Sequence, residues 1–159
     1  MTIIYSREPA HTLWDEILPL LQLHYQEIAT YQDIPLDPDV ERYNAMEAAG
    51  ALRCFTARIG DGLRVPPLIG YSVVITAGNL HYRSSGIAMQ DVLFVHPEHR
   101  RGPAGSGLLD YTETALRQEG LQVIYQHQKT AHPALGIILG RRGYDHVENI
   151  WAKRLDKGD

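Results

Sequence analysis

One stretch of the sequence decides the fold: Asp91-Val92-Leu93-Phe94-Val95-His96-Pro97-Glu98-His99-Arg100-Arg101-Gly102-Pro103-Ala104-Gly105-Ser106-Gly107-Leu108-Leu109. It begins as an apolar strand, passes through a glycine-rich turn and ends in a helical pattern. Such a turn presents backbone N–H groups at the positive end of a helix dipole, an arrangement that suits a pyrophosphate. Arg100 and Arg101 are expected to add positive charge. Glycine spacing alone is also typical of an ordinary turn, so the interpretation depends on the surrounding chain.

Upstream of this stretch the sequence predicts one strand, two helical regions and a meander of strands. Ile3-Ile4-Tyr5 is the first strand, and apolar residues at helical spacing over 13–28 predict two joined helical pieces divided at Pro19. Asp37 is expected to cap a second helix, which Gly50 ends. Three further strands are then predicted, at residues 52–59, 68–77 and 87–95.

Downstream, the pattern predicts a helix over 104–119 that Gly120 ends, and then a buried strand over 121–127. Another helix is expected from residue 132 through 139, followed by strand material over 144–155. No repeat, low-complexity tract or linker interrupts this order. We therefore expect a single domain over residues 1–159.

Composition and charge exclude several classes of protein. The chain has 159 residues, of which 44% are hydrophobic, and a net charge of −4, which disfavours nucleic acid as a partner. It shows neither a signal-peptide pattern nor an apolar run long enough for a membrane helix, so we expect a cytoplasmic protein without a membrane partner. Cys54 lies in an apolar run and is expected to be buried. His96 and His99 flank a turn, and no cysteine or carboxylate cluster completes a ligand set, so no metal is expected.

In this context the decisive stretch resembles the acetyl-CoA-binding motif of the GNAT superfamily of N-acetyltransferases. In that motif a strand ending in V-x-P is followed by R-x-x-G-x-G/A and by a helix that begins with a leucine pair. The residues in register are Val95, Pro97, Arg100, Gly105, Leu108 and Leu109. The family's order of elements matches nearly the whole chain. A narrower pattern, formed by His81-Tyr82, Asp91 and the run from Pro97 to Gly105, is similar to small GNAT-like proteins of bacteriophages and prophages.

The resemblance implies an α+β fold in α/β/α layers. Its sheet would be mixed, mostly antiparallel and twisted, with helices on both faces and a cleft where the fourth and fifth strands splay apart. It also implies acetyl-CoA as co-substrate, held by main-chain groups after the fourth strand and in the turn, with residues 123–127 as the opposite wall. The residues expected to bind it are Phe94, Val95, Arg100, Arg101, Gly102, Pro103, Ala104, Gly105, Ser106 and His132.

Two positions depart from the family pattern. Pro103 stands where the motif usually has its first glycine, and proline has no backbone N–H to offer a phosphate oxygen. The same residue equally suits the first position of a helix. Leu139 stands where many members carry the tyrosine that protonates the departing thiolate. The proton donor must then lie elsewhere, and Tyr125, His127 and His132 are the candidates.

Direct acyl transfer needs a proton acceptor, and Asp91 is the leading candidate. It lies two residues from Met89 on one strand, so the two point to one face, and Met89 is close to where some relatives carry a catalytic glutamate. An aspartate in a strand is also commonly a structural partner of an arginine or of the backbone. Two roles are likewise possible for His81 and Tyr82: they could line the acceptor side of the cleft, or they could support the start of the strand through hydrogen bonds.

Two functions therefore compete. The first is an N-acetyltransferase that moves an acetyl group from acetyl-CoA to a primary amine by direct attack, with a backbone N–H near Val95 holding the oxyanion. The acceptor would be a small-molecule or peptide amine, which Asp39, Glu41 and Glu47 could attract, and a homodimer is left open. The second is a GNAT-shaped binding or structural protein without catalysis, encoded by a phage.

Overall fold

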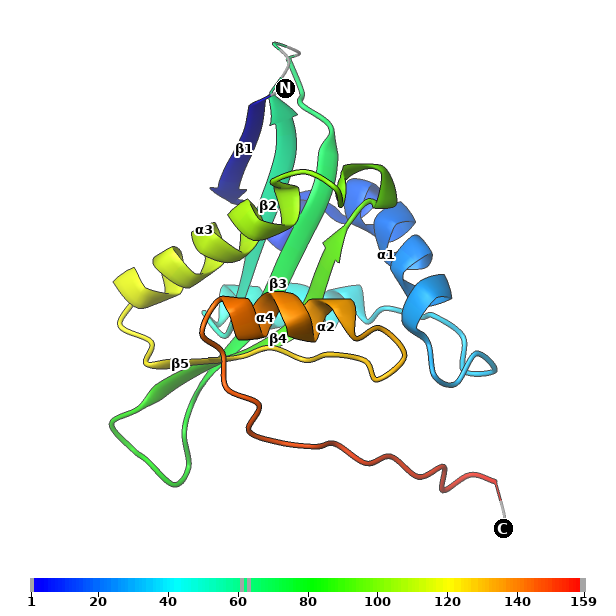
Figure 1. Cartoon of the computed structure of the whole chain (residues 1–159), viewed down its shortest axis with the longest axis vertical. Coiled ribbons are helices and arrows are strands. Elements are labelled where there is room, and N and C mark those ends of the chain that lie inside the picture. The colour runs from blue at the N-terminus through cyan, green and yellow to red at the C-terminus, as the bar shows by residue number, and fades with distance from the viewer. Residues whose placement is uncertain (1, 61, 63, 158–159) are drawn as a thin grey trace. The chain divides into compact units, whose positions relative to one another are not determined.

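The computed structural model describes residues 2–60, 62 and 64–157, and the chain divides into two compact units. The first unit ends at His127 and the second begins at Gln128. In chain order the elements of the first unit are β1 (Thr2–Arg7), a 3-10 turn η1 (Ala10–Thr12), α1 (Trp14–Ile28), α2 (Val40–Ala48), β2 (Leu52–Gly60), β3 (Leu68–Gly78), β4 (Gly86–Val95), a 3-10 turn η2 (Pro97–His99), α3 (Ala104–Gln118) and β5 (Val123–Tyr125) (Figure 1). The second unit contains α4 (Ala134–Arg141). None of the helices in these ranges is both long enough and apolar enough to cross a membrane.

The five strands form one open sheet in the order β1-β2-β3-β4-β5. The first four strands pair antiparallel with their neighbours, and β5 joins β4 in parallel. Each antiparallel neighbour in the sheet is also the next strand along the chain. Short connections join β2 to β3 and β3 to β4, whereas η1, α1 and α2 lie between β1 and β2. The predicted α+β class, with a mixed and mostly antiparallel sheet, is confirmed.

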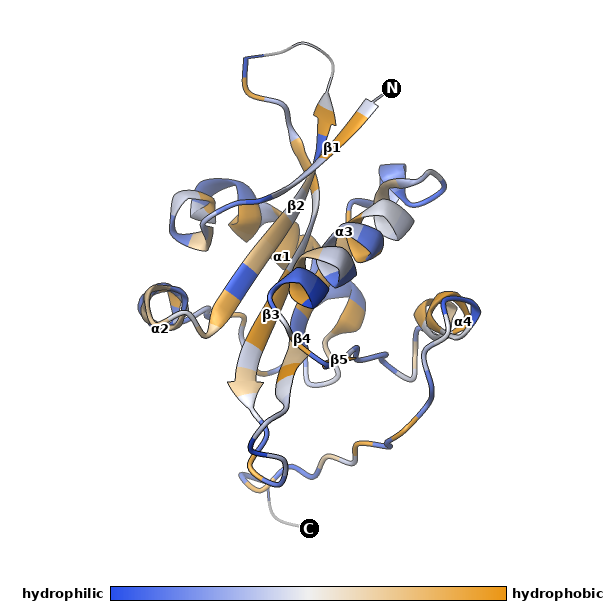
Figure 2. Cartoon of the chain, turned by 90° about the vertical axis from the view of Figure 1, so that its left-hand side faces the viewer, coloured by the Kyte–Doolittle hydropathy of each residue, from blue (hydrophilic) through white to orange (hydrophobic). Residues whose placement is uncertain are grey.

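Helices cover both faces of the sheet, because its central strands are apolar on both sides. On one face α1 packs through Ile17 and Leu20 against a cluster that includes Cys54 of β2. On the other face α3 packs through Leu108 and Leu116. Figure 2 shows the hydrophobic colour concentrated along the central strands and hydrophilic colour on the outer turns of α3. Cys54 is 1% exposed, and burial raises its pKa to about 12, which confirms that it belongs to the core.

Two helix predictions need correction. Residues 14–28 form the single helix α1, which continues through Pro19 instead of dividing there. Packing of the neighbouring Ile17 and Leu20 on the sheet holds the helix together despite the N–H that proline lacks. The cap of α2 is Asp39, not Asp37, because the Asp39 Oδ1 accepts a hydrogen bond of 2.9 Å from the Arg42 amide.

The strands predicted last are shorter than expected or not formed. Only Val123–Tyr125 of the buried strand expected over 121–127 pairs with β4, and Val123 is 42% exposed. Within the first unit β5 has a neighbour on one side only, so it cannot be buried as a central strand is. Residues 144–155, expected to be strand material, form no strand in the described structure.

The second unit holds one regular element. Helix α4 begins at Ala134, two residues later than expected, and runs two residues beyond Leu139, which is buried. Gly143 follows the helix with a φ of 84°, the left-handed conformation in which a helix commonly ends. The following segment leaves its large apolar side chains exposed, among them Trp151 at 92%. The single-domain organisation of the whole chain stays a prediction.

Arg58 joins β2 to two other segments of the first unit. Its guanidinium is 2.8 Å from Glu8, just after β1, and 2.8 Å from Glu16 of α1, and it also donates to the Pro66 carbonyl at 2.8 Å. The Arg58 residue is only 8% exposed. A buried guanidinium needs such partners, because an uncompensated charge in the interior is strongly unfavourable.

The contact between α3 and β1 explains why residue 107, in the first turns of α3, is a glycine. Tyr5 of β1 donates a hydrogen bond of 3.0 Å from its hydroxyl to the Pro103 carbonyl. The Tyr5 ring then lies so close to Gly107 that a Cβ at that position would be 2.2 Å from the Tyr5 oxygen. A glycine at 107 therefore lets the tyrosine lie across the first turn of α3.

We expect Gly107→Ala to lower the free energy of unfolding by about 1–3 kcal/mol, because the new methyl group must displace the Tyr5 ring. In a Tyr5→Ala background the same substitution should instead be neutral or stabilising by up to about 1 kcal/mol, since alanine is the better helix former. Urea unfolding of the four proteins measures the difference. Equal effects in both backgrounds would show that Tyr5 is not the reason for the glycine.

Candidate functional site at the fork between two strands

The strand, turn and helix predicted to bind a pyrophosphate are formed as expected. β4 ends at Val95, η2 follows it, and α3 begins at Ala104. Pro103 is the N-cap of α3 and not its first residue. The first turn of α3 contains no acidic side chain, so the positive end of its dipole is not offset there.

Several main-chain donors of this turn are without acceptors. The first amide of α3 with an intrahelical bond is that of Gly107, which donates to the Pro103 carbonyl at 2.9 Å. Within the described ranges no acceptor is found for the amides of Ala104, Gly105 and Ser106. Ala104 is fully buried, so the donors that a ligand can reach are those of Gly105 and Ser106. Pro103 itself has no backbone N–H to add to this set.

Arg100 is engaged within the protein. Its Nε donates to the Val95 carbonyl at 2.8 Å, and its Nη2 lies 2.9 and 2.8 Å from the two carboxylate oxygens of Glu27. The guanidinium also lies over the Phe94 ring, 5.4 Å from its centroid. Arg100 therefore fastens the turn to α1 and to the end of β4, with its charge largely compensated. Arg101 is exposed and forms no side-chain hydrogen bond or ion pair with the other described residues, so its charge is available to a ligand.

The fourth and fifth strands part after a short contact. Backbone pairing joins β4 and β5 at three positions, the last of which is Met89 opposite Tyr125. Beyond this pair the contact is made by a side chain and not by the backbone of β4: the Gln90 Oε1 accepts a hydrogen bond of 2.9 Å from the His127 amide. Among the described residues, β4 then continues from Gln90 to Val95 without a strand on that side. The predicted splay of the two strands is confirmed. We call the place where β4 separates from β5, from Gln90 onward, the fork.

Asp91 occupies a β-bulge of β4. The pairing of β3 with β4 passes from Val73–Val92 to Val74–Gln90, which leaves Asp91 as the extra residue. Its Oδ2 accepts a hydrogen bond of 2.5 Å from the hydroxyl of Tyr43, on α2. Burial, and then the neighbouring Asp91, raise the pKa of Tyr43, so the phenol remains the donor.

Tyr43 is a site residue that sequence reasoning missed. Its ring packs edge-on against Trp14, with ring centroids 5.3 Å apart, as a core tyrosine would. Nothing in the sequence distinguishes a core tyrosine from one whose hydroxyl reaches a strand carboxylate 48 positions away. Only the sheet register with its bulge brings Tyr43 and Asp91 together.

The remaining candidates fall into two groups. Tyr125 and His127 lie beside Met89 and Gln90, immediately before Asp91 on β4, so the structure brings these three candidates to the fork. Gln126, between them, has an amide that is shielded from solvent and has no hydrogen-bond partner in the described structure, which no sequence pattern indicated. His132 belongs to the second unit, and its expected part in the site stays a prediction.

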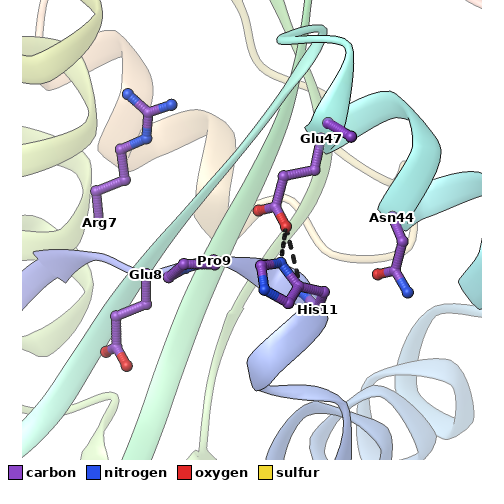
Figure 3. A pocket seen from close by; sticks show the side chains of 7 residues that line it. Arg7, Glu8, Pro9, His11, Asn44 and Glu47 are labelled. Carbon is purple, nitrogen blue, oxygen red and sulfur yellow. Dashed lines mark hydrogen bonds and ion pairs between the residues drawn. The ribbon is translucent and has the colours of Figure 1, made fainter.

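Elsewhere in the first unit lies a pocket of about 460 Å³ (Figure 3). It is lined by Arg7, Glu8, Pro9, His11, Asn44, Glu47 and Ala48, none of which was predicted as a catalytic or cofactor residue. Both of its acidic groups are already engaged: Glu47 accepts from the Ala10 amide at 2.6 Å and lies 2.8 Å from His11 Nδ1, and Glu8 pairs with Arg58. Of the three acidic residues expected to attract an amine, Asp39 is likewise engaged as a helix cap, which leaves Glu41.

By sequence alone, no protein-family model and no curated protein matches the chain. Solved structures share its fold over nearly its whole length. An aminoglycoside acetyltransferase from an uncultured soil metagenomic sample, solved with sisomicin, has a TM-score of 0.70 and 15% identity, covering 96% of both chains. Ribosomal-protein-alanine N-acetyltransferase from Brucella melitensis has a TM-score of 0.73 and 15% identity over 97% of this chain and 100% of its own. A predicted acetyltransferase from Clostridium acetobutylicum, solved with acetyl-CoA, has a TM-score of 0.70 and 10% identity over 97% of both.

Proposed function

We propose that this chain is an N-acetyltransferase that moves the acetyl group of acetyl-CoA to a primary amine. One observation carries the proposal: the fork where β4 leaves β5 adjoins a turn whose amides at Gly105 and Ser106 have no acceptor within the described structure. An extended anionic co-substrate needs both features, a gap along a strand and donors at a helix N-terminus. The shared fold supports the proposal, since one neighbour was solved with acetyl-CoA and another with an aminoglycoside.

In this proposal the turn and β4 have separate tasks. The amides of Gly105 and Ser106 and the guanidinium of Arg101 hold the diphosphate, while Arg100 keeps the turn in place through Glu27 and Val95. Main-chain groups of β4 along the fork orient the acyl arm. The amine nitrogen then bonds to the thioester carbon, the carbon–sulfur bond breaks, and the sulfur leaves as a thiolate.

The proton balance of this reaction assigns roles to side chains at the fork. Asp91 accepts the proton of the attacking amine, directly or through water, and Tyr43 orients its carboxylate. The thiolate takes a proton from Tyr125, His127 or His132, which remain the alternatives. The acceptor would be a small-molecule or peptide amine.

A second function is favoured by specific observations. Pro103 offers no N–H, Ala104 is buried, and Leu139 is a core residue where a proton-donating tyrosine would be expected. Each of these features reduces the machinery for binding or for catalysis. They suit a protein that has kept the scaffold and acts by binding, as the phage-like pattern in the sequence suggests.

Acetyl-CoA should raise the melting temperature of the protein. At a ligand concentration of about 100 times Kd, binding to the folded state alone adds about 2.7 kcal/mol. For a chain of this size that corresponds to roughly 5–10 °C. A thermal-shift titration measures it, and the absence of any shift at millimolar acetyl-CoA would contradict the proposal.

A matched pair of variants locates the site. Gly105→Ala should retain binding, because its Cβ would meet the Val95 side chain at an ordinary 3.9 Å and the amide remains. Gly105→Trp should abolish the shift by covering that amide. Binding that survives in both variants would place the co-substrate elsewhere. Binding without release of free coenzyme A, over a panel of amines, polyamines, aminoglycosides and peptides, would favour the second function.

A further inference from the structure

Three side chains around η2 converge in a way that the sequence pattern did not predict. Ligand atoms of His96, Glu98 and His99 all lie within 4.8 Å of one another. These residues join the end of β4 to the glycine-rich turn. They take no part in the transfer reaction proposed above.

The geometry of the 3-10 turn brings the two histidines together. With three residues per turn, side chains at positions i and i+3 lie one above the other. The His99 amide closes the turn by donating to the His96 carbonyl at 2.9 Å. The two imidazole rings therefore lie side by side, with centroids 5.9 Å apart.

His96 has an unused ligand atom that faces into this cluster. Its Nδ1 is shielded from solvent and has no hydrogen-bond partner among the described residues. The carboxylate oxygen of Glu98 lies 4.0 Å from it, which is too far for a hydrogen bond. Two ligands of one tetrahedral Zn²⁺ lie about 3.3 Å apart, given bonds of about 2.0–2.2 Å. The Glu98 side chain is 79% exposed, so a small rotation can close the remaining distance.

We propose that His96, Glu98 and His99 bind a divalent transition-metal ion. Two imidazoles and a carboxylate suit Zn²⁺ and leave a fourth position for water. The sequence argument against a metal assumed that no carboxylate completes the histidine pair, and the 3-10 turn supplies one. The neighbouring positive charge of Arg100 is compensated by Glu27, so it opposes the bound cation only weakly.

The test uses the full chain, stripped of metal with a chelator and then titrated with Zn²⁺ in competition with a chromophoric chelator. One ion per chain is expected. His96→Gln and His99→Gln should each weaken binding by about 100-fold or more, and Glu98→Gln by about 10-fold. His81→Gln and His146→Gln are the matched controls, and both should bind Zn²⁺ as the unmodified chain does.

Failure of the unmodified chain to bind Zn²⁺ at micromolar concentration would overturn the proposal, and so would unchanged binding in His96→Gln and His99→Gln. Melting curves of the metal-free variants show whether they fold. If either histidine variant is unfolded, Glu98→Gln, a change at an exposed side chain, decides the question. Acetyl-CoA binding is measured separately by the thermal shift, so failure of one proposal does not affect the other.

Discussion

Arg58→Met is expected to lower the free energy of unfolding by about 3 kcal/mol, one of the two largest effects that we predict for this chain. Methionine keeps much of the volume of the arginine but removes the hydrogen bonds that Arg58 donates to Glu8, Glu16 and the Pro66 carbonyl. Two carboxylates are then left without their cation. The value lies at the lower end of the range for buried pairs because Glu16 is partly exposed.

The pH dependence of this effect follows from Glu8. Burial alone would raise the pKa of Glu8, but hydrogen bonds from Arg58 and Thr56 outweigh it and hold the pKa below its ordinary value. A carboxyl whose pKa is lower in the folded state stabilises the fold above its unfolded pKa, and this contribution is lost as the pH falls through the folded pKa. The difference between the unmodified chain and Arg58→Met should therefore shrink below about pH 4.

Urea unfolding at pH 7 and at several values below 4 measures both effects. Arg7→Met is the matched control, because its ion pair with Glu119 is solvent-exposed and is expected to contribute less than about 1 kcal/mol. An Arg58→Met protein that is no less stable than Arg7→Met would show that the Arg58 cluster does not stabilise the fold. A difference that persists unchanged at low pH would remove Glu8 from the explanation.

Asp91→Asn is expected to lower kcat by about 10²–10⁴-fold once an amine acceptor has been identified, because an amide cannot accept the proton of the attacking amine. Binding of acetyl-CoA should be unchanged, since Asp91 lies on the bulge and not in the turn. Thermal stability should change little, because asparagine can still accept the hydrogen bond from Tyr43. Coenzyme A release and a thermal-shift titration on the same preparation measure the rate and the binding.

Tyr43→Phe separates proton transfer from positioning. The variant keeps the aromatic packing on Trp14 and removes only the hydrogen bond to Asp91. As a positioning residue, Tyr43 should affect kcat by about 10-fold, which a tyrosine with a purely structural role would not do. An Asp91→Asn protein with an unchanged rate would eliminate Asp91 as the base, whatever Tyr43 does.

The sequence predicted the strands up to Val95 and helix α3 closely. Their apolar residues form clear runs or recur at helical spacing, and the elements end at residues with distinct conformational preferences. Gly50 and Gly120 illustrate this, since both adopt the positive φ that ends a helix. The turn between β4 and α3 could be placed because proline, glycine and the leucine pair mark its ends. The identity of the phage-like subgroup, suggested by His81-Tyr82, stays a prediction.

What the sequence could not predict depends on contacts between distant segments. The cap of α2 was misplaced because Asp37 and Asp39 carry the same side chain, and only the hydrogen bond to Arg42 distinguishes them. The ion pair of Arg100 could not be predicted because Glu27, its partner, is 73 residues away, and its expected contact with the co-substrate stays a prediction. The convergence of the residues around η2 depends on a local 3-10 geometry that hydrophobic periodicity does not encode.

The brevity of the contact between β4 and β5 has a consequence for how such a protein can evolve. From Gln90 onward, the edge of β4 that faces away from β3 offers main-chain groups to whatever lies beside it. Recognition through amides and carbonyls tolerates almost any side chain, so long as the backbone keeps its path. At an exposed position of this segment, such as Asp91, mutations can then accumulate without loss of a partner, whereas Val92, Phe94 and Val95 belong to the core and must stay apolar.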